Sequence, residues 1–186
     1  MQNNTNEENL KNDILQNNFK FIDLFAGIGG FRIALETFGG KCVFSSEWDK
    51  HAQITYETNF GDKPAGDITK IEEQSIPHHD VLCAGFPCQP FSISGKKLGF
   101  QDIRGTLFFD ITRIVDFHKP KVIFLENVKH FVNHDKGNTR QVVINKLKSL
   151  EYDVFDTVLN SSDFGIPQSR KRYYLIAFKK NLKIKN

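Results

Sequence analysis

The chain has 186 residues, which is enough for one domain with a substantial buried core. Its content of 39% hydrophobic and 25% charged residues is typical of a water-soluble globular protein, and no apolar stretch approaches the roughly 18 residues of a membrane span. The net charge of +3 is too small to indicate a polyanionic partner, although residues 164–186 contain seven Lys or Arg and no acid.

The number and spacing of the cysteines argue against a fold held together by disulfides or by zinc. There are three of them, Cys42, Cys83 and Cys88, an odd number without a C-x-x-C pair, which argues against a disulfide framework and against a zinc site. The N-terminus lacks the profile of a signal peptide. We therefore expect a cytoplasmic protein with reduced thiols, no metal and no membrane segment.

Residues 1–18 are rich in Asn and predict a loose tail, whereas from residue 19 onward short apolar runs alternate with helical stretches. Strands are expected over 19–25, 41–45, 81–84, 121–125, 152–159 and 172–179, and helices over 31–38, 49–59, 106–117 and 137–150. This alternation predicts one α/β domain over 19–180, followed by a short tail over 181–186. Its sheet should be doubly wound and mostly parallel, with ligands at the carboxyl ends of the strands.

A glycine-rich turn, Ala26-Gly27-Ile28-Gly29-Gly30, joins the first strand to the first helix. Glycine lets the backbone bend sharply and approach a ligand closely. The spacing G-x-G-G differs from the dinucleotide fingerprint G-x-G-x-x-G, so an NAD enzyme is disfavoured. The alternative is a tight turn with no ligand.

Two further segments could complete a nucleoside pocket. Glu47-Trp48-Asp49 follows the second strand, where an acid can bind ribose hydroxyls and the Trp48 ring offers a flat face to adenine. Gly66-Asp67-Ile68 could close a third side. The alternatives are ordinary core packing for Trp48 and a turn or helix cap for Asp67.

Cys88 lies between Pro87 and Pro90, directly after a buried strand. Prolines hold a loop extended, which suits a side chain that must be aimed. A single cysteine is more often a small buried hydrophobe, and Cys42 and Cys83, inside apolar runs, fit that description.

The ordered segments DLFAGIGG, EWD, GDIT, GFPCQPFS, RGTLFF, ENV and QSRKR resemble the motifs of the cytosine-5 DNA methyltransferases of bacterial restriction–modification systems. The resemblance covers nearly all of 19–180. It implies a Rossmann-like methyltransferase fold that transfers a methyl group from S-adenosylmethionine, leaving S-adenosylhomocysteine. The acceptor would be C5 of a cytosine flipped out of double-stranded DNA.

The resemblance also implies residue roles. Cys88 would attack C6 of the cytosine, Glu126 would hold the N3 edge, and Arg172 would meet O2. Taken singly, Glu126 could equally be a helix-capping acid. The full catalytic set would be Cys88, Glu126, Asn127, Gln168, Arg170 and Arg172, and the cofactor contacts Phe25, Ile28, Gly30, Glu47, Trp48, Asp67, Ile68 and Leu107.

The segment Ser92–Arg104 resembles the loop that closes over DNA in this family, with Gly95 and Gly99 for mobility and Lys96, Lys97 and Arg104 for phosphates. Family members continue past the match at Lys180 into a target-recognition region. We therefore expect either a truncated product or one subunit of an enzyme completed by a second polypeptide. The alternatives are an inactive remnant that only binds cofactor, and an RNA cytosine-5 methyltransferase, because one branch of the family acts on transfer RNA.

Overall fold

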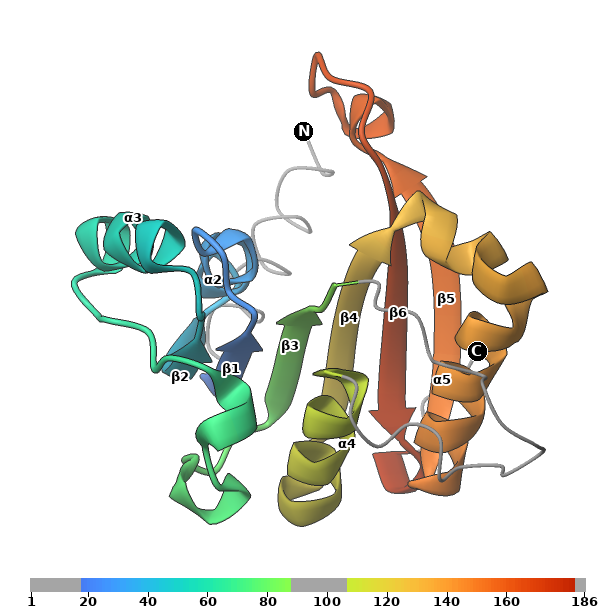
Figure 1. The fold of residues 1–186 in the computed structure, drawn as a ribbon, viewed down its shortest axis with the longest axis horizontal. Coiled ribbons are helices and arrows are strands. Elements are labelled where there is room, and N and C mark those ends of the chain that lie inside the picture. Colours follow the sequence, from blue (N-terminus) through green and yellow to red (C-terminus); the bar gives the residue numbers. More distant parts are fainter. Residues whose placement is uncertain (1–17, 88–106, 183–186) are drawn as a thin grey trace, which may run out of the picture.

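The computed structural model describes residues 18–87 and 107–182, which form a six-stranded sheet in the order β2-β1-β3-β4-β6-β5 (Figure 1). The strands are β1 (Phe19–Leu24), β2 (Gly40–Ser46), β3 (Val81–Gly85), β4 (Val122–Val128), β5 (Tyr152–Asn160) and β6 (Lys171–Lys179). Each of the six expected strands is present, and the predicted fold class is confirmed.

One strand of the sheet, β6, runs opposite to the other five. β2, β1, β3 and β4 pair in parallel, whereas β6 runs antiparallel to both of its neighbours, β4 and β5. β2 and β3 lie on opposite sides of β1, so the sheet grows outward from β1 in both directions. This is the switch point at which doubly wound sheets bind their ligands.

Helices cover both faces of the sheet. α2 (Gly30–Glu36) and α3 (Lys50–Phe60) follow β1 and β2, while α4 (Leu107–His118) and α5 (Asn138–Ser149) lie in front of the sheet in Figure 1. On the other face, Phe31 of α2 packs edge-on against Phe124 of β4, with ring centroids 5.1 Å apart. The connecting 3-10 turns are Ile68–Lys70, Glu73–Ser75, Lys129–Gly137, Ser161–Phe164 and Lys180–Leu182.

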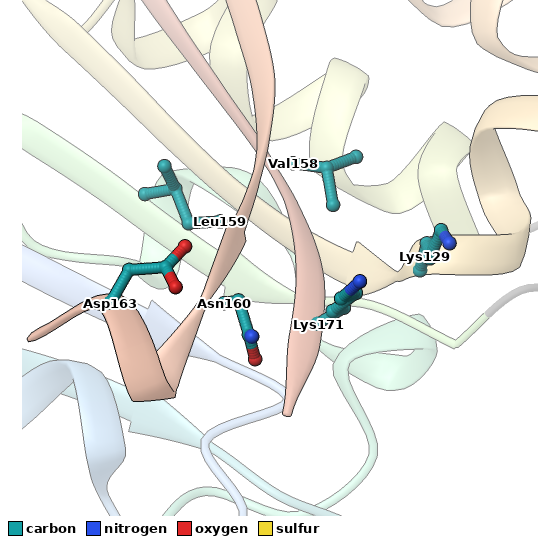
Figure 2. A pocket seen from close by; sticks show the side chains of 6 residues that line it. All are labelled: Lys129, Val158, Leu159, Asn160, Asp163 and Lys171. Carbon is teal, nitrogen blue, oxygen red and sulfur yellow. The ribbon is translucent and has the colours of Figure 1, made fainter. Parts of the chain in front are cut away.

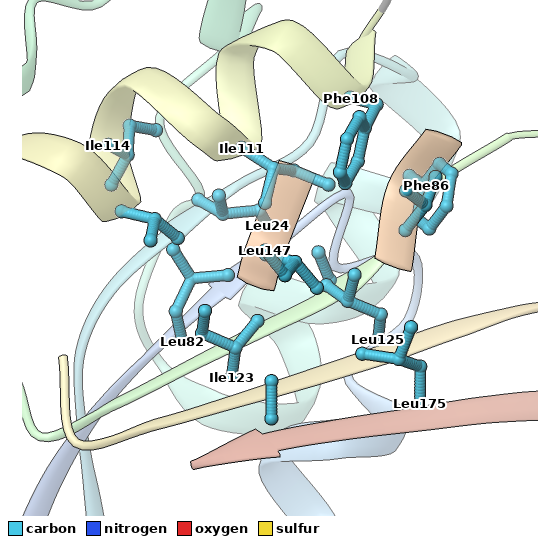
Figure 3. Close-up of a cluster of buried hydrophobic side chains, with 14 of the residues drawn as sticks. Leu24, Leu82, Phe86, Phe108, Ile111, Ile114, Ile123, Leu125, Leu147 and Leu175 are labelled. Atoms are coloured by element: carbon cyan, nitrogen blue, oxygen red, sulfur yellow. The ribbon is translucent and has the colours of Figure 1, made fainter. Parts of the chain in front are cut away.

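The main core lies between the sheet and helices α4 and α5 (Figure 3). Successive side chains of a strand point to opposite faces, so alternate residues of each strand face this core. Those drawn and labelled in Figure 3 are Leu24, Leu82, Phe86, Phe108, Ile111, Ile114, Ile123, Leu125, Leu147 and Leu175. Most of the continuous apolar strands in the sequence are therefore explained by burial on both faces of the sheet.

A buried arginine joins α2 to α3. Arg32 is 9% exposed, and its guanidinium lies over the ring of Phe60 at 4.5 Å from the centroid. It also donates to Glu36 and Asp62, each at 2.8 Å. Because the charge is paired and its flat face packs on an aromatic ring, Arg32 can be buried without a large desolvation cost.

Among the described residues, no helix combines the length and apolarity that crossing a membrane requires. The predicted tails over 1–18 and 181–186 fall almost entirely outside the described residues and stay predictions.

Stability should depend on pH through His79, which is 1% exposed and lies two residues before β3. Its Nδ1 lies 2.8 Å from the carbonyl of Pro77, and its ring packs against His118 at 4.7 Å between centroids. Burial lowers the pKa of His79 from 6.5 to about 4. Between these two values the unfolded chain binds a proton that the folded chain does not, so the free energy of unfolding should fall as pH falls from 7 to 4, by up to about 3 kcal/mol.

Urea unfolding of His79→Asn across this pH range tests the prediction, because Asn keeps a donor for Pro77 but does not titrate. The variant should show a shallower pH dependence than the wild type. An exposed histidine in α3 supplies the control for loss of an imidazole, His51→Asn, measured over the same pH range. Equal slopes for His79→Asn and the wild type would contradict the assignment.

Candidate functional site

The glycine-rich turn after β1 is held in a sharply bent conformation. Phe25 has a φ of 56°, which is rare for a residue with a side chain, and Gly29 has a φ of 94°. A methyl group added to Gly29 would lie 2.2 Å from the ring of Phe60, so only glycine fits there. The amide of Ala26 donates to the carbonyl of Ser46 at 3.0 Å, which fastens the turn to the end of β2.

Glu47 connects this turn to the residues after β2. Its side chain is nearly buried, with 8% of the residue exposed. One carboxylate oxygen accepts from the amide of Gly27 at 2.8 Å and the other from the amide of Asp49 at 2.9 Å. The carboxylate is therefore fixed at the carboxyl ends of β1 and β2, where a ribose-binding acid was expected.

Trp48 is the most exposed large hydrophobic residue in the described chain, at 78%, and Ile28 on the glycine-rich turn is 59% exposed. The alternative of ordinary core packing for Trp48 is therefore wrong. Two exposed apolar side chains next in sequence to residues bonded to a fixed carboxylate are suited to a ligand with both an aromatic and a polar part.

Backbone hydrogen bonds hold the segment that leads to Asp67 at the carboxyl end of β2. The amide of Glu47 donates to the carbonyl of Ala65 at 2.9 Å, and the amide of Ala65 donates to Ser45 at 2.8 Å. Asp67 accepts from the backbone amide and the hydroxyl of Thr69, which lowers the pKa of Asp67. It thus caps a 3-10 turn, as its alternative reading held, and its contact with a cofactor stays a prediction.

The other predicted cofactor residues differ in how accessible they are. Ile68 is 2% exposed and packs in the main core, so a ligand could reach only its backbone. Leu107 is the first residue of α4 and is half-buried, as is Phe25. Methyl groups added to Gly27 or Gly30 would meet no other atom within 4 Å, which leaves space for a ligand above the turn. These features fit a nucleoside-containing cofactor.

Glu126 lies inside β4 and not at a helix end, so its reading as a helix cap is wrong. Its Oε1 is 3.0 Å from Nε of Arg172 in β6, and both side chains are half-buried. Burial raises the pKa of Glu126, and the nearby charges of Arg172 and Arg170 partly offset this effect. The carboxyl is thus paired with a guanidinium and still shifted toward its protonated form.

Asn127 braces the strand end next to Glu126. It is 2% exposed, and its Nδ2 donates to the carbonyl of Phe86 at 2.9 Å, while its Oδ1 accepts from the amide of Val128 at 2.8 Å. Phe86 directly follows β3. Asn127 therefore holds the backbone carbonyl two residues before Cys88 in the sequence.

The loop between β5 and β6 carries Gln168 and Arg170, whose side chains are exposed. Ser161 holds this loop closed: its amide donates to the carbonyl of Arg170 at 3.1 Å, and its hydroxyl donates to the carbonyl of Gln168. Gln168 thus takes part in ordering the turn through its backbone. Arg170 is free in the described structure to meet a ligand.

Cys88 and the predicted lid Ser92–Arg104 lie outside the described residues. The structure does define the point from which they depart. Gly85, the last residue of β3, pairs with Glu126, and a methyl group on Gly85 would lie 3.5 Å from the Glu126 carboxylate. Chain connectivity therefore places Cys88 three residues beyond a backbone position adjacent to Glu126.

Asp23, which is 0% exposed near the carboxyl end of β1, was not predicted from the sequence. Burial raises the pKa of Asp23 well above the ordinary value, and the backbone amide and the charge of Arg32 offset only part of this effect. Its strand neighbours in register are Ser45 and Cys83. The signal was available, because an acid inside an apolar strand is unusual.

Cys42 and Cys83 are free thiols inside strands, and burial raises the pKa of each, so they fit the description of small core residues. In residues 18–87 and 107–182, no group of three or more His, Cys, Asp or Glu side chains is arranged to hold a metal ion.

Comparisons with known proteins agree with this geometry. Residues 19–186 match the family model of the C-5 cytosine-specific DNA methylases. The chain is 62% identical over 167 residues to the Type II methyltransferase M.HhaI of Haemophilus parahaemolyticus, covering 90% of this chain and 51% of that protein. It is 57% identical over 174 residues to the Type II methyltransferase M.HpaII of Haemophilus parainfluenzae, covering 91% of this chain and 49% of that protein.

Solved structures show the same fold. A DNMT2 variant from Spodoptera frugiperda superposes with a TM-score of 0.73 at 31% identity, covering 89% of this chain and 51% of its own. A putative DNA modification methyltransferase from an Escherichia coli prophage gives 0.74 at 26% identity, covering 90% of this chain and 49% of its own. The chain thus spans about half the length of the curated relatives it matches. By sequence and by fold, it belongs to the C-5 cytosine-specific DNA methylase family.

Proposed function

We propose that this chain is the cofactor-binding and catalytic lobe of a DNA cytosine-5 methyltransferase, which takes its methyl group from S-adenosylmethionine and acts on double-stranded DNA. The observation that carries the proposal is the pair formed by Glu126 and Arg172. An acid with a raised pKa and an arginine lie 3.0 Å apart beside the strand that leads to Cys88.

The cofactor would lie over the glycine-rich turn. Glu47 would accept from the ribose hydroxyls, Trp48 and Ile28 would pack against the adenine, and the open backbone at Gly27 and Gly30 would admit the rest of the molecule. When bound, S-adenosylmethionine supplies an electrophilic methyl group on a sulfonium.

The side chains of this lobe supply the remaining chemistry. The Cys88 thiolate would add to C6 of the flipped cytosine, forming a C–S bond and moving the ring electrons toward N3 and C5. The Glu126 carboxyl would place its proton at N3, so that no full negative charge develops on the ring. Once C5 carries the methyl group, a water molecule would accept the C5 proton as the C6–S bond breaks, releasing the Cys88 thiolate, and N3 would return its proton to the Glu126 carboxylate. Arg172 would orient Glu126 and the O2 edge of the base.

The choice between DNA and RNA is open to a direct test. The match of residues 19–186 to the C-5 cytosine-specific DNA methylases favours DNA. Labelled methyl transfer to duplex DNA and to transfer RNA compares the two substrates.

We also propose that a second polypeptide with a target-recognition region completes the enzyme. Labelled methyl transfer with and without this second polypeptide tests the proposal.

Cofactor binding should depend on Trp48 and Glu47. Because stacking of a base on an aromatic ring contributes about 1–3 kcal/mol, Trp48→Ala should weaken S-adenosylmethionine binding by roughly 5- to 150-fold in calorimetry. Trp48 is the only tryptophan, so its fluorescence should change on titration of the wild type. Phe164→Ala removes another aromatic residue, 66% exposed, and serves as a control that should not change affinity. Unchanged affinity in both Trp48→Ala and Glu47→Ala would contradict the assigned pocket.

The nucleophile can be identified by trapping. A duplex in which 5-fluorocytosine stands opposite an abasic site makes flipping less costly, and fluorine at C5 blocks the final elimination. With S-adenosylmethionine present, mass spectrometry should find the adduct on Cys88. Cys88→Ala should abolish it, whereas Cys42→Ala and Cys83→Ala should lower stability and leave adduct formation possible. An adduct on another residue would overturn the mechanism.

The pH dependence of trapping should report on Glu126. As pH rises through the pKa of Glu126, the carboxyl loses the proton that N3 requires, so the rate of adduct formation should fall on the alkaline side. Glu126→Gln should remove this limb and slow trapping by roughly 10²-fold or more. Arg172→Gln removes a charge that lowers the pKa of Glu126, so the alkaline limb should move to higher pH. If the alkaline limb of Arg172→Gln lies at the same pH as that of the wild type, an effect of Arg172 on the pKa of Glu126 is excluded.

A further inference from the structure

Arg113 joins α4 to the segment that carries Asp67. All three nitrogens of its guanidinium donate: Nε to Asp110 at 2.9 Å, Nη1 to Glu73 at 2.7 Å and Nη2 to the carbonyl of Ile68 at 2.7 Å. The side chain is only 17% exposed. Asp110 belongs to α4 itself, so the two bonds that leave the helix both reach the 3-10 turns before β3, which pack beside α4 (Figure 1).

The bond to Ile68 fixes one peptide unit from outside its turn. The carbonyl of Ile68 also accepts from the amide of Ile71 at 3.2 Å, a bond that shapes the turn from within. The amide at the other end of the same peptide unit, that of Thr69, donates to Oδ1 of Asp67 at 3.0 Å. Because a peptide unit is planar, Arg113 and Asp67 hold opposite ends of one rigid group.

This arrangement leaves one oxygen of Asp67 for a ligand. Oδ1 accepts from both the amide and the hydroxyl of Thr69, at 3.0 and 2.8 Å. Oδ2 accepts no hydrogen bond from residues 18–87 and 107–182, and the ammonium of Lys70, on an exposed side chain, is 3.8 Å away. A carboxylate held by one oxygen can accept from a donor group of a bound molecule with the other.

The same segment is anchored at the edge where the cofactor is proposed to bind. Ala65, two residues before Asp67, pairs with the backbone at the end of β2, where its carbonyl accepts from the amide of Glu47 at 2.9 Å. Asp67 lies between this attachment to β2 and the attachment of Ile68 to α4. The position of Asp67 relative to Glu47 therefore depends on Arg113.

We infer that Arg113 is a positioning residue for S-adenosylmethionine, which holds the Asp67 carboxylate, through the Ile68–Thr69 peptide unit, in the orientation that receives the cofactor. The inference rests on the proposed function, because it concerns the same cofactor site. Arg113 itself needs no contact with the cofactor. A buried ion pair contributes little net stability once desolvation is counted, whereas the rigid fork of donors on an arginine fixes the geometry of its partners.

Calorimetric titration of the purified chain with S-adenosylmethionine tests the inference through a double-mutant cycle. Arg113→Gln should weaken binding roughly fivefold, as expected for residues coupled through one hydrogen-bond network. In an Asp67→Ala background the same substitution should weaken binding by less than about twofold, because the carboxylate that Arg113 positions is gone. Urea unfolding should show that Arg113→Gln lowers stability in both backgrounds.

Two control variants separate positioning from a loss of stability or of charge. Glu73→Gln breaks an ion pair of Arg113 but leaves the bond to Ile68, so stability should fall while affinity stays within about twofold of the wild type. Lys129, which lines the hollow drawn in Figure 2, follows β4 and is separated from β2 by β1 and β3. Lys129→Gln thus removes a positive charge remote from Asp67 and should leave affinity unchanged.

A measurement without cofactor reports on the peptide unit itself. Hydrogen exchange of the Thr69 amide in the unliganded chain should be faster in Arg113→Gln, because its bond to Asp67 is less well held, and unchanged in Glu73→Gln. If Arg113→Gln does not fold, Arg113→Lys takes its place, since it keeps the charge but lacks the planar fork that reaches three acceptors at once. Its affinity should fall in the same background-dependent way.

The outcomes separate this inference from the function on which it rests. If the wild type binds S-adenosylmethionine and Arg113→Gln matches Glu73→Gln in affinity, the positioning role is refuted and the proposed function stands. An equal loss of affinity with and without the Asp67 side chain would refute it too, as would an unchanged affinity in Asp67→Ala alone. If the wild type neither binds S-adenosylmethionine nor forms the Cys88 adduct, both proposals fall.

Discussion

The ion pair between Glu126 and Arg172 is the interaction on which the proposed site depends. Burial of a carboxylate is costly, and here the guanidinium of Arg172 offsets that cost only in part, so the pKa of Glu126 stays raised. Both residues lie in strands of one sheet, with Val128 opposite Arg172 in the register of β4 and β6. Their separation is thus set by backbone hydrogen bonds. A proton donor held in this way needs little rearrangement when a base arrives.

The end of β4 also positions the backbone that leads to Cys88, the proposed nucleophile. Asn127 faces the core side of β4, opposite to Glu126, and its buried amide fixes the carbonyl of Phe86. Glu126 and Asn127 are consecutive in β4, and successive side chains of a strand point in opposite directions. One side chain therefore lies at the proposed active site while the other fixes the backbone on the opposite face of the sheet. A shift of one residue in the pairing of β3 with β4 would exchange these roles and leave the amide of Asn127 without its partner.

Much of this arrangement could be predicted from the sequence, because apolar runs mark the strands and glycine or polar residues mark their carboxyl ends. Glu47 and Trp48 were expected at the edge where the structure has them. The position of Glu126 inside a strand could not be predicted locally, since β4 extends to Val128 only because β6 pairs with it there. Asp23 differs from Glu126, because an acid within an apolar run is visible in the sequence, although the contacts that bury it come from β2 and β3. Long-range pairing is not visible in a local pattern.

The reversal of β6 explains how a single basic run in the sequence is divided between two ends of the molecule. In a purely parallel sheet only the carboxyl ends of strands reach the binding edge. Because β6 is antiparallel to β4, its first residues, Lys171 and Arg172, reach that edge as well, together with Arg170 just before them. The last residues of the strand are carried to the opposite edge, where Lys180 lies 3.6 Å from Glu151. The seven basic residues from 164 to 186 are consequently not one surface, and only those at the start of β6 are placed beside the proposed active site.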